Sequence, residues 1–158
     1  MRKLFIPILL LATLFTQAQK SSIDLAFIRN THTDLNGLNL SYFHHFNERL
    51  TGGLEMNRFF TKRVVDEDAE LDLSAWDFDL NLHYLLPLNK NWRIYPITGI
   101  SHTSEKEIVV ETQEKTITRF WSYNAGAGVL FQSGKWAPHA EYLFTFGHMN
   151  QQFFLAGI

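Results

Sequence analysis

Hydrophobic and polar residues alternate along most of the chain after residue 19. The clearest segment is 76–84, in which the even-numbered residues are Trp, Phe, Leu, Leu and Tyr and the odd-numbered ones are Asp, Asp, Asn and His. Successive side chains of a β-strand point to opposite faces, so a period of two indicates strands. The pattern predicts eight strands, at 23–27, 38–46, 54–57, 76–84, 92–103, 121–131, 136–146 and 151–158. In 92–103 and 151–158, the pattern does not predict which residues share a face.

The connections between these strands also alternate, in length. Tight polar turns at 46–49, 88–91 and 132–135 follow the second, fourth and sixth strands. The segments 30–36 and 147–150 are modest loops, whereas 62–70 and 103–118 are long and acidic. Short turns at one end, longer loops at the other and an even strand count are typical of bacterial outer-membrane barrels. The predicted fold is therefore all-β, an eight-stranded antiparallel up-and-down transmembrane β-barrel.

The apolar faces of these strands carry many of the aromatic rings of the chain, which has 14 Phe, 5 Tyr and 4 Trp. The interior of an eight-stranded barrel is only wide enough to be filled by side chains. Because so many rings would not fit inside, we expect them to face lipid. The alternative is a soluble secreted lipocalin-like barrel, in which the same rings would line an apolar ligand cavity. The residues expected to face lipid are Trp76, Phe78, Leu80, Leu82, Tyr84, Trp121, Tyr123, Trp136, Tyr142 and Phe144.

The first residues have the composition of an export signal. Arg2 and Lys3 precede an apolar run at 4–15, and small residues close the segment at Ala18. This pattern predicts a signal peptide at 1–18 and a barrel domain at 19–158. The net charge of −2, without a basic cluster, argues against a nucleic-acid partner. The chain has no cysteine, which excludes disulfides, cysteine nucleophiles and a lipoprotein anchor.

The second half of the chain resembles a known family. The resemblance is strongest from Trp92 to Ile158, and the Asn-Ala-Gly-Ala-Gly stretch at 124–128 is similar to a small-residue strand of that family. This is the family of small eight-stranded outer-membrane β-barrels of the OmpA/OmpX type, often called outer membrane beta-barrel or porin family proteins. The resemblance implies a Gram-negative outer membrane, with the turns in the periplasm and the loops outside the cell.

The polar faces of the strands carry the residues with possible chemistry. Charges in a narrow lumen must be paired or hydrated, so we expect a structural network that fills the barrel and leaves no open pore. An alternative is that His83, His139 and the carboxylates bind a divalent metal or relay protons. We favour the structural interpretation, with no metal and no cofactor. The predicted lumen cluster consists of Glu55, Asp77, Asp79, His83, Arg93, His139 and Glu141.

One motif suggests catalysis. His102, Ser104 and Glu105 place an imidazole, a hydroxyl and a carboxylate close together near the outer rim. His102 and Ser104 resemble the His-x-Ser element of the lipid A deacylases, in those two residues alone. They are weak candidates for a lipid A-modifying enzyme, and we predict no catalytic residue.

The two long loops are β-prone on both sides of their tips. Segments 107–111 and 115–120 flank one tip, and 63–65 and 69–73 flank the other. These segments predict hairpins that extend beyond the bilayer and offer an edge for strand addition by another protein. Our leading hypothesis is a monomeric outer-membrane barrel with a structural or adhesion-like surface role and without catalysis. Its expected partners are outer-membrane lipid, lipopolysaccharide and a protein at the hairpins.

Overall fold

The computed structural model describes residues 20–66 and 69–158. The signal peptide expected at 1–18 lies outside these residues. Within them, no helix is long and apolar enough to cross a membrane. The chain forms nine β elements: β1 (Ser21–Asn30), β2 (Leu35–His45), β3 (Leu50–Asp66), β4 (Ala69–Tyr84), β5 (Leu86–Pro87), β6 (Trp92–Val109), β7 (Lys115–Phe131), β8 (His139–Gly147) and β9 (Gln151–Gly157).

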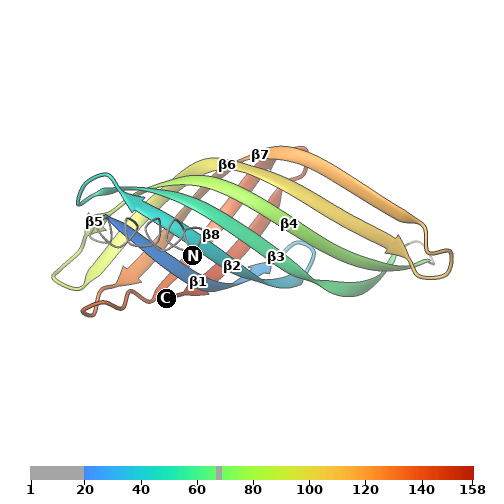
Figure 1. The fold of residues 1–158 in the computed structure, drawn as a ribbon, viewed down its shortest axis with the longest axis horizontal. Coiled ribbons are helices and arrows are strands. Elements are labelled where there is room, and N and C mark those ends of the chain that lie inside the picture. The colour runs from blue at the N-terminus through green and yellow to red at the C-terminus, as the bar shows by residue number, and fades with distance from the viewer. Residues whose placement is uncertain (1–19, 67–68) are drawn as a thin grey trace, which may run out of the picture.

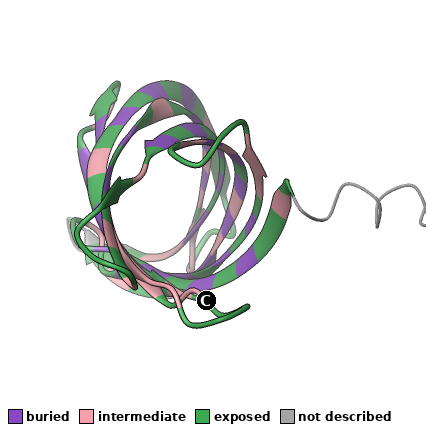
Figure 2. Ribbon diagram, turned by 90° about the vertical axis from the view of Figure 1, so that its left-hand side faces the viewer, coloured by how far each residue is buried: buried purple, intermediate pink, exposed green. Residues whose placement is uncertain are grey.

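These elements form one closed antiparallel barrel (Figures 1 and 2). Each strand pairs with its neighbours in the sequence, and β9 pairs with β1 to close the ring. The short β5 continues β4 after Leu85, because both pair with β6. The barrel therefore has eight strands, as the alternation predicted. Closure leaves no strand edge within the ring, which a membrane-spanning sheet requires.

The strands alternate between an apolar outer face and a buried inner face (Figure 2). Tyr123 is 72% exposed, whereas its neighbour Asn124 is 3% exposed. Trp76 and Phe78 are likewise exposed, at 39% and 54%. A soluble lipocalin-like barrel would need these rings inside, so the structure contradicts that alternative. Nine of the ten residues expected to face lipid lie on strands and are exposed on the outer face, and the tenth, Trp136, is exposed in the connection before β8.

Four strands extend far beyond the rest of the barrel (Figure 1). The pairing of β2 with β3 stops at Phe59, and that of β7 with β8 stops at Ser122. Beyond these points β3 pairs with β4, and β6 pairs with β7, as far as the tips of the two hairpins. The two acidic segments thus form the long hairpins that the sequence predicted. We call this end the hairpin end and the opposite end the short-turn end.

The structure differs from the sequence prediction at the start of β8. The strand begins at His139 and not at Trp136, since Pro138 has no N–H to donate to the ladder. Residues 132–138 form a longer connection, in which Ser133 and Trp136 make an isolated bridge. Trp136 is 66% exposed in this connection and is not part of a strand.

The sequence predicted a polar filled lumen, but part of the interior is apolar. A cluster of buried apolar side chains includes Phe59 and Phe153, whose ring centroids are 5.8 Å apart. A second part of the cluster surrounds Tyr95. Gly128 lies opposite Tyr95, and a Cβ at this glycine would overlap the Tyr95 ring. The remaining buried members are Ile28, Leu35, Ala75, Ile97, Leu143 and Leu155.

Candidate functional site

Two of the buried carboxylates, Glu55 on β3 and Asp79 on β4, accept hydrogen bonds from asparagine side chains. Asn81 Nδ2 donates to Glu55 Oε1 at 2.9 Å, and Asn57 Nδ2 donates to Asp79 Oδ2 at 2.7 Å. Asn124 on β7 donates to Asn81 Oδ1 on β4 at 3.0 Å, past Gly99 of the intervening β6. Amide N–H groups thus stabilise these carboxylates where water is excluded.

The lumen contains more acidic than basic side chains. Among the described residues, no lysine or arginine is buried, whereas six carboxylates are. Asp77 is 3% exposed, and its Oδ1 has no hydrogen-bond partner. The buried carboxylates are Asp24, Glu55, Asp77, Asp79, Glu105 and Glu141.

The two histidines of the predicted cluster contact different carboxylates, and Tyr95 and Glu141 lie between them. His83 Nε2 is 3.5 Å from Glu55 Oε1, and its ring stacks on Tyr95 with centroids 5.3 Å apart. His139 Nδ1 is 3.5 Å from Asp24 Oδ1. Within residues 20–66 and 69–158, no three Asp, Glu or His side chains are grouped so that they could share one metal ion. The metal interpretation would therefore need other ligand types.

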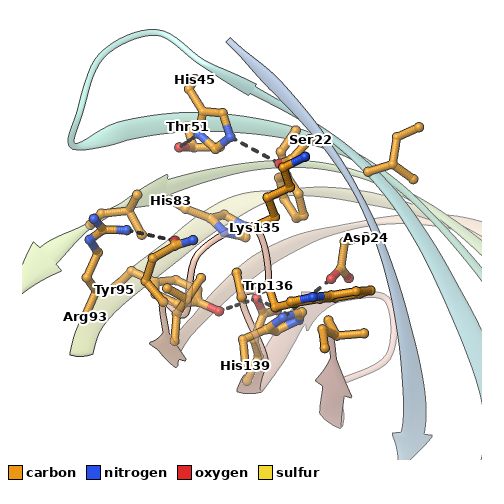
Figure 3. Close-up of a pocket in the computed structure, with 18 residues that line it drawn as sticks. Ser22, Asp24, His45, Thr51, His83, Arg93, Tyr95, Lys135, Trp136 and His139 are labelled. Carbon is orange, nitrogen blue, oxygen red and sulfur yellow. Dashed lines mark hydrogen bonds and ion pairs between the residues drawn. The ribbon is translucent and has the colours of Figure 1, made fainter. Parts of the chain in front are cut away.

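A cavity of about 330 Å³ lies at the short-turn end (Figure 3). Arg93 lines it and donates from Nη1 to Gln132 Oε1 at 3.3 Å. Trp136 also lines it, while Asp24 and His139 face each other on its wall. Arg93 therefore belongs to the wall of this cavity and makes no ion pair with the lumen carboxylates among the described residues.

The candidate catalytic residues do not form a catalytic group. His102 and Ser104 lie on the outer face of β6, where the His102 ring contacts Trp121 with centroids 4.8 Å apart. Glu105 points inward and accepts a hydrogen bond from Gln151 Nε2 at 2.7 Å. A nucleophile, its base and an orienting acid must lie within hydrogen-bond reach of one another. Here the acid is on the opposite face of the strand, so the arrangement does not support acyl transfer.

The hairpin end carries an ion pair between β3 and β4. Arg63 Nε donates to Asp72 Oδ1 at 3.0 Å. This hydrogen bond lowers the pKa of the Asp72 carboxyl below its ordinary value. Asp34, in the connection between β1 and β2, has a lowered pKa for the same reason, because Arg29 donates to it at 2.7 Å.

The sequence prediction missed a transverse row of outward-facing residues near the base of the hairpins. Arg58, Trp76, Ser104 and Arg119 are register partners on β3, β4, β6 and β7. The Arg58 guanidinium lies 4.7 Å from the centroid of the Trp76 ring. No sequence signal marks this row, because its members are far apart in the chain and come together only through the register.

A family model described as the outer membrane protein beta-barrel domain matches residues 9–152. The chain belongs to this family. It is an outer-membrane β-barrel, with its apolar outer face in lipid. In such barrels the short turns are periplasmic and the longer loops are extracellular. The same orientation in this chain would place the cavity at the periplasmic end and make the hairpins an extracellular sheet. The chain has no significant match among curated proteins.

Solved outer-membrane barrels share its fold. Ail, the attachment invasion locus protein of Yersinia pestis, is 16% identical with a TM-score of 0.61, and the match covers 87% of this chain and 95% of Ail. The N-terminal β-barrel of Pseudomonas aeruginosa OprF is 15% identical with a TM-score of 0.63, covering 87% and 93%. Neisserial surface protein A is 9% identical with a TM-score of 0.64, covering 87% and 91%. At these identities the likeness concerns the fold alone.

Proposed function

We propose that this outer-membrane β-barrel is a surface-interaction protein that binds a partner protein by strand addition at the edge of its extracellular sheet. The observation that carries this proposal is the one-sided pairing of β7. Residues 115–121 lie beyond the last rung with β8, Ser122 with Gly147, and pair only with β6. An edge strand of this kind has backbone N–H and C=O groups available for another chain.

The edge of β7 is more open than the edge of β3 on the other side of the sheet. Lys62 on β3 donates to Thr33 O at 3.4 Å and lies 3.8 Å from Asp34 Oδ2, so the connection between β1 and β2 contacts the β3 edge. On β7, the ring of Phe120 contacts His148, with centroids 5.5 Å apart, and this contact lies near the base of the strand. The segment 115–119 above it is the better docking edge.

The side chains of the β7 edge favour an extended, acidic partner segment. Lys115 and Arg119 are exposed, and Ile117 between them is 44% exposed. Backbone pairing would supply affinity, and these alternate side chains would supply specificity. Ail, which has the same fold, is an attachment invasion locus protein, and a structure of Ail contains the heparin analogue sucrose octasulfate. An attachment role for this chain is part of our proposal.

The lumen supports this role without chemistry of its own. In our proposal the carboxylate–amide network and the apolar cluster fill the barrel, leave no open pore and keep the strands rigid. His102 and Ser104 then serve as outer-face residues and not as a catalytic pair.

Shortening the β6–β7 hairpin tests the proposal. Lys106 and Ile117 are register partners, so residues 107–116 can be replaced by Asn-Gly, which forms a two-residue hairpin turn. We expect the shortened barrel to fold and to lose attachment of expressing cells to epithelial cells and immobilised matrix proteins by at least about tenfold.

The matched control shortens the other hairpin. Arg63 and Asp72 are register partners, so Asn-Gly can replace residues 64–71. This control should attach as the intact barrel does. Equal attachment by the barrel without residues 107–116, with heat-modifiable migration showing that it is folded, would contradict strand addition at β7.

A further inference from the structure

Three cations lie on the outer face of the barrel in one region near the base of the extracellular sheet. Arg58 and Arg119 occupy the two ends of the transverse row formed with Trp76 and Ser104. Adjacent strands are about 4.8 Å apart, so a row across four strands spans roughly 14 Å. Lys106 lies two residues beyond Ser104 on the same face of β6. We call Arg58, Lys106 and Arg119 the basic row.

The facing of the basic row follows from its neighbours. Asn57 and Phe59 are buried in the lumen, at 3% and 1% exposed, so Arg58 between them points outward. Thr103 and Glu105 are buried in the same way, which places Ser104 outside. Phe120 is buried next to Arg119. The three cations therefore project from the outer face of the barrel.

The basic row has no acidic partner of its own. Among the described residues, no carboxylate oxygen lies within 4.0 Å of Arg58, Lys106 or Arg119. The Arg58 guanidinium is instead held against the Trp76 ring and donates to Ala75 O at 3.3 Å. Two other cations at this end differ, because Arg29 and Arg63 each pair with an aspartate, at 2.7 and 3.0 Å. The positive charge of the basic row is thus available to an external anion.

The surface directly below the basic row is apolar. The next transverse row towards the membrane consists of Met56, Phe78, His102 and Trp121. Phe78 is 54% exposed and Trp121 is 65% exposed, and Tyr123 one step further is 72% exposed. A ligand that used both surfaces would have anionic groups at its head and hydrocarbon chains below.

We propose that the basic row binds the phosphate groups of a phosphorylated, acylated glycolipid of the outer leaflet. Arginine presents a planar fork of N–H donors that matches phosphate oxygens, and Lys106 adds a point charge. The acyl chains of the lipid lie along Phe78, Trp121 and Tyr123. Arg119 takes part in both proposals, but the lipid contacts side chains of the outer face, whereas strand addition pairs with the backbone edge of β7.

The test measures lipid retention by folded barrels. The probes are nanodiscs of phosphatidylcholine containing either bisphosphorylated lipid A or lipid A from which both phosphates have been removed. Native mass spectrometry gives the fraction of barrels that keep the glycolipid. We expect the triple variant R58Q/K106Q/R119Q to bind bisphosphorylated lipid A at least about tenfold more weakly than the unchanged protein.

The matched control removes the same number of positive charges from three other cations at this end. The variant R29Q/K62Q/R63Q should keep the affinity of the unchanged protein, and dephosphorylated lipid A should bind weakly to all three. If the triple variant of the basic row does not fold, Arg119→Gln alone should lower the affinity several-fold.

Three results would overturn the proposal. One is equal affinity of the basic-row variant and the unchanged protein, and another is equal binding of phosphorylated and dephosphorylated lipid A. The third is full displacement of the lipid by inorganic phosphate or by sucrose octasulfate, which would identify a site for soluble anions. The barrel that lacks residues 107–116 retains the basic row and should keep the lipid, which separates this proposal from strand addition.

Discussion

At the scale of single residues, neutral side chains donate hydrogen bonds to four of the six buried carboxylates of the lumen. Glu55 accepts hydrogen bonds from Asn81 and Asn39, at 2.9 and 3.4 Å. Glu105 accepts one from Gln151, and Glu141 accepts one from the Tyr95 hydroxyl. A buried polar group without a partner costs far more than a satisfied one contributes. Substitutions in this network should therefore act mainly through the groups that they leave unsatisfied.

Replacing Glu55 tests this account of the network. In Glu55→Ala the amides of Asn39 and Asn81 each lose an acceptor, and His83 loses the carboxylate 3.5 Å away. We expect a loss of roughly 2–4 kcal/mol in the free energy of unfolding, and a smaller loss for Glu55→Gln, which keeps one acceptor oxygen. Urea unfolding from lipid vesicles measures both. Glu48→Ala, in the exposed turn after β2, serves as the control, and equal stabilities of the Glu55 and Glu48 variants would contradict the prediction.

At the scale of elements, the extracellular sheet differs from the barrel below it. Its four strands do not close into a ring: β4 pairs with β6 between the two hairpins, and β3 and β7 are the edges. The β3–β4 hairpin carries Arg63, which contacts Asp72 at 3.0 Å and Glu70 at 3.4 Å. These pairs are exposed and screened by salt, and such pairs contribute little to stability when isolated. Their effect should be local to the hairpin.

The ion pair of Arg63 predicts a pH dependence of this hairpin. Because the hydrogen bond from Arg63 lowers the pKa of Asp72, the carboxylate stabilises the hairpin at neutral pH. That contribution is present above the ordinary aspartate pKa of about 3.9 and is lost as the pH falls through the lower pKa of the folded hairpin. Carbon NMR titration of Asp72 should show a pKa below its ordinary value, and Arg63→Gln should raise it.

Asp34 provides the internal control for this titration. Its pKa is lowered by Arg29 and not by Arg63, so Arg63→Gln should leave it unchanged. An unchanged Asp72 titration in Arg63→Gln would contradict the assignment of the ion pair.

At the scale of the whole molecule, the sequence was sufficient for the architecture but not for its interior. Alternation predicts facing only where one face is apolar and the other polar, as in 76–84. In β9, Phe153 points inward and Phe154 outward. Because both faces of β9 are apolar, the alternation does not predict which residues point inward. The apolar cluster of the lumen was missed for this reason. The basic row was missed for a different reason. Arg58 and Arg119 lie in one transverse row only because distant segments of the chain pair in a particular register.

Both proposals require that the hairpin end of the molecule lies outside the cell, and labelling of single cysteines tests this. The chain has no cysteine, so a single introduced thiol has no background. Glu114 lies in the connection of the β6–β7 hairpin, and Lys90 lies in the turn between β5 and β6. A maleimide on a large polyethylene glycol cannot cross the outer membrane. It should therefore label Glu114→Cys on intact cells at least about tenfold more than Lys90→Cys, because short turns are periplasmic in this class of barrel. Permeabilised outer membranes should label both variants equally. Labelling of Lys90→Cys on intact cells would place the β7 edge and the basic row in the periplasm, where neither a surface partner nor an outer-leaflet lipid could reach them.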